Sequence, residues 1–268
     1  MDILNYSFFQ HALIGSLLAS ILCGIIGTYI VTRRLVFISG GITHASFGGI
    51  GIGVFLGINP ILSAMVFSIM SACGVQWLST KGNIREDSAI AMFWTLGMSI
   101  GICSFLTPGF MPDLPSFLFG SILTIGVSDL LLLGSLCLIT TILFVFFYQT
   151  IICVAFDPIF AKSQRLPVQT IEYVLMILIA MAIVSTLRMV GIVLAMSLLT
   201  IPQMTANLFT YNFKRMIYLS IAFGWLDCLL GLSISYWFNV PSGASIIFIG
   251  IVLYALCKAF KTLQKHIH

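Results

Sequence analysis

The sequence predicts an all-α integral membrane protein, a polytopic bundle of about nine transmembrane helices. A number of about eight to ten helices is compatible with the hydropathy pattern. Hydrophobic residues make up 60% of the chain and charged residues only 7%. The mean hydropathy is +1.13, and soluble domains do not have this balance. The run LLLLGSLCLITTILFVFF is continuously apolar, whereas the strands of a membrane barrel alternate over about ten residues. We expect one transmembrane domain over residues 1–268.

Each predicted span is an apolar stretch long enough to cross a hydrocarbon core of about 30 Å, which takes about 20 helical residues. In chain order the spans are 12–32, 36–57, 61–79, 89–107, 128–149, 170–187, 190–209, 216–238 and 243–257. Little of the chain remains between them. We therefore expect short connections and a multi-pass topology.

Basic residues set the expected orientation, because Lys and Arg concentrate on the cytoplasmic side. With nine crossings, one side receives Arg33, Arg34, Lys81, Arg85, Lys162, Arg165, Lys214, Arg215, Lys258, Lys261 and Lys265. Of the 12 basic residues only Arg188 falls on the other side. We expect the N-terminus outside and the C-terminus in the cytoplasm, and we attribute the net charge of +4 to topology and not to nucleic-acid binding. The N-terminus lacks the basic start and the obvious cleavage site of a signal peptide, so we expect the first span to stay in the protein as a transmembrane helix.

The second span carries a single strongly polar side chain, His44, among small residues. Ala45, Gly49, Gly53 and Gly57 recur every four residues, a spacing that lines one helix face and lets neighbouring backbones approach closely in lipid. This helix is expected inside the bundle. His44 should then face protein or water and not lipid.

The connection between the fifth and sixth spans, residues 154–170, predicts a short surface helix near 157–166. Asp157 can cap the free N–H groups and Pro158 suits the first helical position, while Pro167 closes the segment. An ordinary loop helix fits this pattern, and so does a docking element. Exposed apolar side chains favour docking, and the candidates are Phe156, Ile159 and Phe160.

Five ordered segments resemble the membrane permeases of metal-type ABC transporters, which import manganese, zinc or iron. They are RRLVFISGGITHASFGGIGIG, FLFGSILTIGVSDLLLL, VAFDPIFAKSQRLPV, VGIVLAMSLLTIPQMTA and GLSISYWFNVPSGASI. The first is similar to the family's Arg-x-x-x-Phe-x-Gly-Asp-Ala-Ile-Ser-His-Ala segment, and the third to its Phe-Asp-Pro-x-x-Ala loop. The resemblance covers nearly the whole chain.

The resemblance implies a homodimeric importer subunit in the bacterial cytoplasmic (inner) membrane, in contact with lipid. A separate cytoplasmic ATPase would use the ATP, and the short helix would dock on it through Phe156, Asp157, Pro158, Phe160, Ala161 and Arg165. An extracytoplasmic metal-binding protein would deliver the ion, and residues 107–117 form the longest outer loop for that contact. The chain itself would be no enzyme and hold no covalent cofactor. Consistently, it has no G-x-x-x-x-G-K-[ST] phosphate loop. Arg165 stands where the family usually has Gly.

The metal path is where this chain departs from the family. An Asp and a His four residues apart are associated with the path in the family, and here they correspond to Gly40 and His44. A metal bound by His44 would need the second copy's His44, backbone carbonyls, or the hydroxyls of Ser39, Thr43 and Ser46. Asp227, central in the eighth span, is a further candidate, because an intramembrane acid indicates a functional site. His44 and Asp227 can each instead be an interhelical hydrogen-bonding residue.

Pro202 can kink the seventh span and free a carbonyl towards the path, or kink it with no functional effect. Glu172, at the start of the sixth span, is expected to be structural. A secondary, ion-coupled transporter for a metal or small solute is the alternative function, but it would need several intramembrane acids. An intramembrane hydrolase would need a nucleophile beside a base. The residues do not identify the metal, since imidazole suits zinc or iron and oxygen ligands suit manganese.

Overall fold

The structure of the protein is a computed structural model that describes residues 7–82, 84–105 and 125–267. The expected outer loop at 107–117 lies outside these ranges. The described chain is helical, with α1 (Ser7–Thr32), α2 (Val36–Phe55), α3 (Pro60–Lys81), α4 (Glu86–Phe105), α6 (Val127–Phe146), α7 (Tyr148–Phe156), α8 (Pro158–Ser163), α9 (Val168–Leu198), α10 (Ile201–Phe209), α11 (Phe213–Phe238) and α12 (Ser242–Ile267).

The predicted spans are confirmed within the described residues, where 9 helical segments are long and apolar enough to cross a membrane. The sixth and seventh spans correspond to Val168–Leu187 and Val190–Phe209. Both lie within α9 and its continuation, and they are separated by a kink at Gly191, whose φ of 76° and ψ of 174° are not helical. The chain then breaks at Thr200 and resumes as α10, with Pro202 in its first turn. The seventh span is therefore two helical pieces, and the predicted disruption near Pro202 is confirmed.

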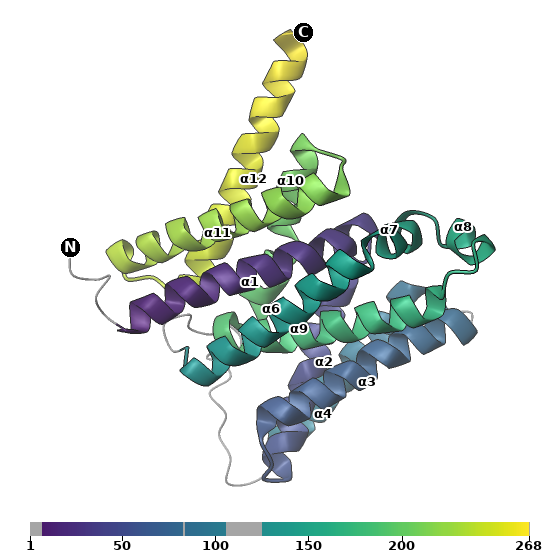
Figure 1. The fold of residues 1–268 in the computed structure, drawn as a ribbon. Coiled ribbons are helices and arrows are strands. Elements are labelled where there is room, and N and C mark those ends of the chain that lie inside the picture. The colour runs from purple at the N-terminus through teal and green to yellow at the C-terminus, as the bar shows by residue number, and fades with distance from the viewer. Residues whose placement is uncertain (1–6, 83, 106–124, 268) are drawn as a thin grey trace.

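Helices α1 and α9 lie in the middle of the bundle (Figure 1). On one side α11 contacts α1, α10 and α12, and on the other α2 packs against α3, α4 and α9. Buried apolar side chains along α1, including Leu22, Ile26 and Ile30, fill the space between the two groups. The short helices α7 and α8 project together from one end of the bundle (Figure 1).

Helix α2 has two small-residue faces, one more than the sequence predicted. On the predicted face, a Cβ added at Gly49 would come 2.6 Å from the Cα of Ala64 in α3. On the second face, a Cβ at Gly48 would come 2.6 Å from the Gly97 carbonyl oxygen in α4. Both helices therefore approach the α2 backbone, as small-xxx-small packing requires. The expectation for Gly57 is wrong: it lies beyond α2 with a φ of 67°, and nothing is within 4 Å of its Cβ position.

A buried carboxylate ties four elements together at the end of the bundle that carries α8. Glu172, near the start of α9, accepts a hydrogen bond from Arg33 Nη2 at 2.9 Å and another from Gln76 Nε2 of α3 at 2.9 Å. Arg33 also donates from Nη1 to the Val154 carbonyl of α7, at 3.3 Å. Arg34 takes a φ of 60°, which ends α1 and turns the chain into α2. The structural role predicted for Glu172 is thus supported by its contacts.

Breaking this pair should destabilise the fold, because the remaining charge would stay buried without its partner. We expect Glu172→Gln to lower the free energy of unfolding by about 3 kcal/mol, measured as a lower midpoint of thermal unfolding in detergent. Glu172→Gln combined with Arg33→Met removes both charges and keeps an acceptor for Gln76. The double variant should be more stable than Glu172→Gln alone, and strict additivity of the two losses would contradict this account.

Candidate metal path and coupling segment

His44 lies half-buried on α2, with its ring stacked on Trp94 of α4. The ring centroids are 4.5 Å apart and the planes differ by 7°. The Nδ1 atom is buried and has no hydrogen-bond partner among the residues that the structure describes. A neutral imidazole with an unpaired nitrogen is a competent ligand for a divalent transition metal. The stack fixes the plane in which that nitrogen can bind.

The space beside Gly40, one helical turn before His44, is filled by side chains from two other helices. A Cβ added at Gly40 would lie 2.9 Å from Met196 Cε of α9 and 3.7 Å from the Trp94 ring. A carboxylate at position 40 would therefore require the Met196 methyl group to move. At Gly40, where the resemblance implies an Asp, the Met196 thioether and the Trp94 indole occupy the space beside the helix.

The hydroxyls proposed as further ligands are buried and already use their protons. Ser39 donates to the Val36 carbonyl at 2.7 Å, and Thr43 donates to the Ser39 carbonyl. Ser46 donates in the same way to the Thr43 carbonyl. Their lone pairs remain as possible weak ligands, but these bonds hold the hydroxyls against the α2 backbone.

The structure does not place Asp227 and Pro202 with His44 in one protomer. Asp227 is buried on α11 against α12, and its Oδ2 atom would lie 3.2 Å from a Cβ added at Gly250. Its Oδ1 atom has no partner in the described part of the chain. Pro202 lies beside Gly224 of α11, near α1. Since α2 packs against α3, α4 and α9, the expected compensation of Gly40 by Asp227 within one chain is not supported.

The carbonyl that Pro202 leaves without a helical donor does not open towards a path. Leu198 is the last residue of α9, and the chain breaks at Thr200, so the Leu198 carbonyl has no helical donor. Pro202, four positions later, has no N–H to offer it. Gln203 supplies the missing bond: its Nε2 atom donates to the Leu198 carbonyl at 3.0 Å and to the Cys23 carbonyl of α1 at 2.8 Å. The expected free carbonyl is thus corrected to one that is capped by a side chain.

The predicted surface helix is present as α8. Asp157 caps it, since its Oδ1 atom accepts from the Phe160 N–H at 2.8 Å, and Pro158 occupies the first turn. Ala161 is buried against Val154 and Val168. The outer face carries three exposed apolar side chains, which are Phe156, Ile159 and Phe160. A capped, anchored helix with an apolar outer face is well suited to dock on a partner.

Arg165 closes α8 by its backbone. It takes a φ of 58°, the left-handed conformation that glycine adopts most readily. Its N–H donates to the Lys162 carbonyl at 3.0 Å, and the next N–H, of Leu166, donates to the Ala161 carbonyl at 3.1 Å. These two bonds form a Schellman motif. The Arg165 side chain is exposed and free of this capping role.

Sequence reasoning missed Trp94, Met196 and Gln203 as members of these sites. Trp94 lies outside the five quoted segments, and Met196 lies inside VGIVLAMSLLTIPQMTA without being marked as a site residue. The place of both beside α2 comes from packing between distant helices. Gln203 gave a usable signal, because an amide directly after an intramembrane proline can bond the carbonyl that the proline frees.

Residues 5–261 match the ABC 3 transport family. The chain is 32% identical to the manganese transport system membrane protein MntC of Halalkalibacterium halodurans, over 98% of this chain and 90% of that protein. It is 39% identical to an uncharacterised membrane protein of Synechocystis sp., over 96% of this chain and 92% of the relative. Among solved structures, PsaBC from Streptococcus pneumoniae in complex with Fab matches with a TM-score of 0.84 and 28% identity, over 96% of this chain and 92% of that one.

The hydrogen bond from Gln203 to the Leu198 carbonyl predicts that the effects of substitutions at Gln203 and Pro202 on stability are not additive. Gln203→Leu should destabilise the protein by about 1–3 kcal/mol, because it leaves buried carbonyls unpaired, and thermal unfolding measures the loss. In a Pro202→Ala background the restored N–H can bond the Leu198 carbonyl, so Gln203→Leu should then cost less. An equal loss in both backgrounds would contradict the assignment.

Proposed function

We infer that this chain, which belongs to the ABC 3 transport family, is the membrane permease of a metal importer whose cargo is manganese. The metal permease assignment follows from the family and from the likeness to PsaBC. Manganese is supported by the match to the MntC relative over 98% of this chain. His44 carries the proposal in the structure, since its buried Nδ1 has no hydrogen-bond partner among the described residues and would become a ligand when the path opens to it.

The path we propose uses few ligands. His44 offers one imidazole, and the described atoms nearest to a Cβ at Gly40 belong to Met196 and Trp94 and not to a carboxylate. In a homodimer a second His44 would face the same ion across the two-fold axis, and water would complete the coordination. Such a site binds weakly enough to release the ion, which transport requires.

Energy for transport would come from a separate ATPase that receives α8, with an extracytoplasmic protein supplying the ion. The contacts of α8 support a route for the motion. Phe156, at the end of α7, meets Phe213 of α11 edge-on at 6.4 Å, and the Val154 carbonyl of α7 accepts from Arg33. A displacement of α8 would thus act on α11 and, through Glu172, on α9. The permease would alternate between outward-open and inward-open states with no bond chemistry of its own.

His44→Phe tests the path, because phenyl retains the stack on Trp94 and removes the nitrogen ligands. We expect manganese uptake in proteoliposomes containing the reconstituted complex to fall at least about tenfold. The thermal midpoint and copurification of the ATPase should stay at wild-type levels. Wild-type uptake by His44→Phe would refute the role of His44, and a parallel loss of stability and uptake would indicate a structural histidine.

The same preparation tests the metal. We expect manganese uptake to exceed zinc and iron uptake at equal free concentration, measured with each ion alone and in competition. Faster zinc or iron uptake would overturn the manganese assignment and leave the permease assignment intact.

Arg165→Gly tests a charge contact with the ATPase without disturbing the α8 cap. Glycine takes the left-handed conformation freely, so the variant should gain about 1 kcal/mol of stability. It should also bind the ATPase more weakly, with a larger loss at low salt than at high salt. Arg165→Lys keeps the charge and should retain binding. Unchanged binding by Arg165→Gly at low salt would exclude the charge contact.

A further inference from the structure

We propose that a groove on the outer surface of the bundle, between α6 and α11, binds an anionic phospholipid with its headgroup phosphate at Lys214. The groove has a volume of about 580 Å³, within the range of about 300–1,000 Å³ for pockets that hold small molecules. Its floor is α1, which contacts both α6 and α11. This inference is independent of the proposed cargo and of the ATPase.

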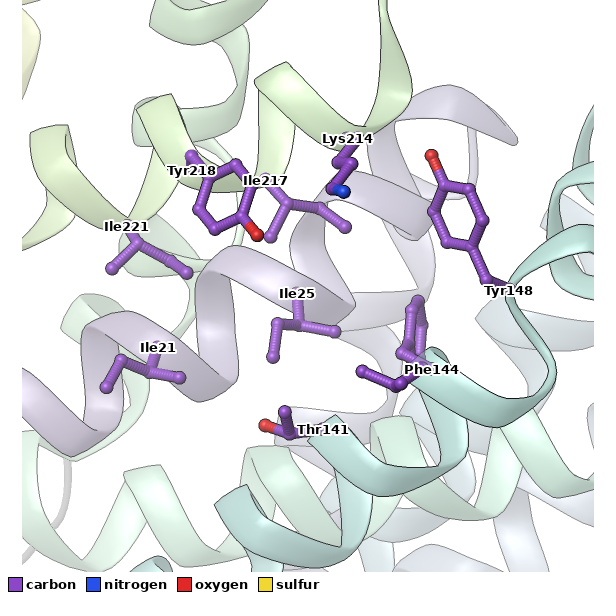
Figure 2. Close-up of a pocket in the computed structure, with 10 residues that line it drawn as sticks. Ile21, Ile25, Thr141, Phe144, Tyr148, Lys214, Ile217, Tyr218 and Ile221 are labelled. Carbon is purple, nitrogen blue, oxygen red and sulfur yellow. The ribbon is translucent and has the colours of Figure 1, made fainter.

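The long part of the groove is apolar. Ile21 and Ile25 of α1 form the floor, Phe144 stands on the α6 wall, and Ile217 and Ile221 stand on the α11 wall (Figure 2). Thr141 is the polar residue of this part, and its hydroxyl donates to the Cys137 carbonyl of its own helix at 2.7 Å. No hydroxyl proton is therefore left for a ligand there. These walls belong to membrane-spanning segments, so an acyl chain is chemically matched to them.

The polar groups gather at one end of the groove. Lys214 reaches into it from the first turn of α11, with Tyr148 of α7 and Tyr218 of α11 on either side (Figure 2). Lys214 forms no ion pair with any residue that the structure describes. Its ammonium group is therefore available to an anion. Lysine and tyrosine at the end of a span mark the headgroup level of a bilayer.

The layout selects one occupant. A cation at the headgroup level above an apolar channel is complementary to a phosphate attached to acyl chains, and basic pockets between transmembrane helices bind such headgroups. A free phosphate would leave the apolar part uncovered. A helix from another protein would need an acidic side chain at the level of Lys214. An anionic phospholipid carries its negative phosphate at that level in every molecule.

The groove lies next to the start of α7, so a bound lipid would contact the segment that leads to α8. Tyr148 is the first residue of α7, which continues through Asp157 into α8. A lipid held by Lys214 and Tyr148 would connect the start of α11 to the start of α7. Its presence should therefore bias the position of the coupling segment.

The test uses the full-length protein in nanodiscs of phosphatidylglycerol or phosphatidylcholine, followed by native mass spectrometry of retained lipid. Wild type should retain phosphatidylglycerol in preference to phosphatidylcholine. Lys214→Gln should reduce that preference about fivefold, the value of one lysine at a membrane surface. Arg215→Gln is the matched control, because Arg215 is exposed on the same helical turn but does not line the groove, and its preference should stay within about twofold of wild type.

A second variant tests the apolar part. Val145 lines the groove and is 69% exposed, so Val145→Trp should fill the groove without disturbing the core and reduce retention of both lipids. Three outcomes would overturn the proposal. They are equal effects of Lys214→Gln and Arg215→Gln, displacement of the lipid by inorganic phosphate, and an efficient disulfide between two copies of Val145→Cys, which would place a second chain over the groove.

Discussion

The buried carboxylate of Glu172 is the interaction on which the organisation of this bundle depends. Desolvating an ion pair is costly, and the cost is offset only when every partner is in place. Arg33 and Gln76 satisfy the two oxygens of Glu172, and the Val154 carbonyl takes a further Arg33 donor. These bonds fix the ends of α1, α3, α7 and α9 relative to one another. Helix α8 is therefore attached to a polar cluster that joins four elements, and not to an isolated loop.

Away from this cluster the helices are held by close backbone contact. Gly48 and Gly97 bring α2 and α4 together, and Gly49 brings α2 to α3. In lipid such contacts replace the hydrophobic driving force that water would supply. The same closeness positions Trp94 of α4 flat against His44. The small residues of α2 thus have a consequence at His44, since the close packing that they allow fixes the orientation of the imidazole.

The sequence was sufficient to predict the spans, the capped helix at Asp157 and the inward position of α2, because each depends on local composition and spacing. It could not place Asp227, whose burial against Gly250 depends on how α11 meets α12. Nor could it reveal that Met196 lies beside Gly40, since α9 is far from α2 in the chain. The segment around Pro202 combines a local feature and a tertiary one. The break in the helix was predictable from the proline, but the hydrogen bond from Gln203 to the Leu198 carbonyl depends on the three-dimensional arrangement.

Gly40 and Arg165 stand where the resemblance implies Asp and Gly, and the structure accommodates the two positions in different ways. Arg165 takes the left-handed backbone conformation, so the turn forms at a small cost in strain and places a positive charge on the surface. At Gly40, where the resemblance implies an Asp, the surroundings are filled by Met196 and Trp94. A path with fewer protein ligands holds its ion less tightly and depends more on retained water. Selectivity in such a path would therefore rest more on the delivering protein than on the permease.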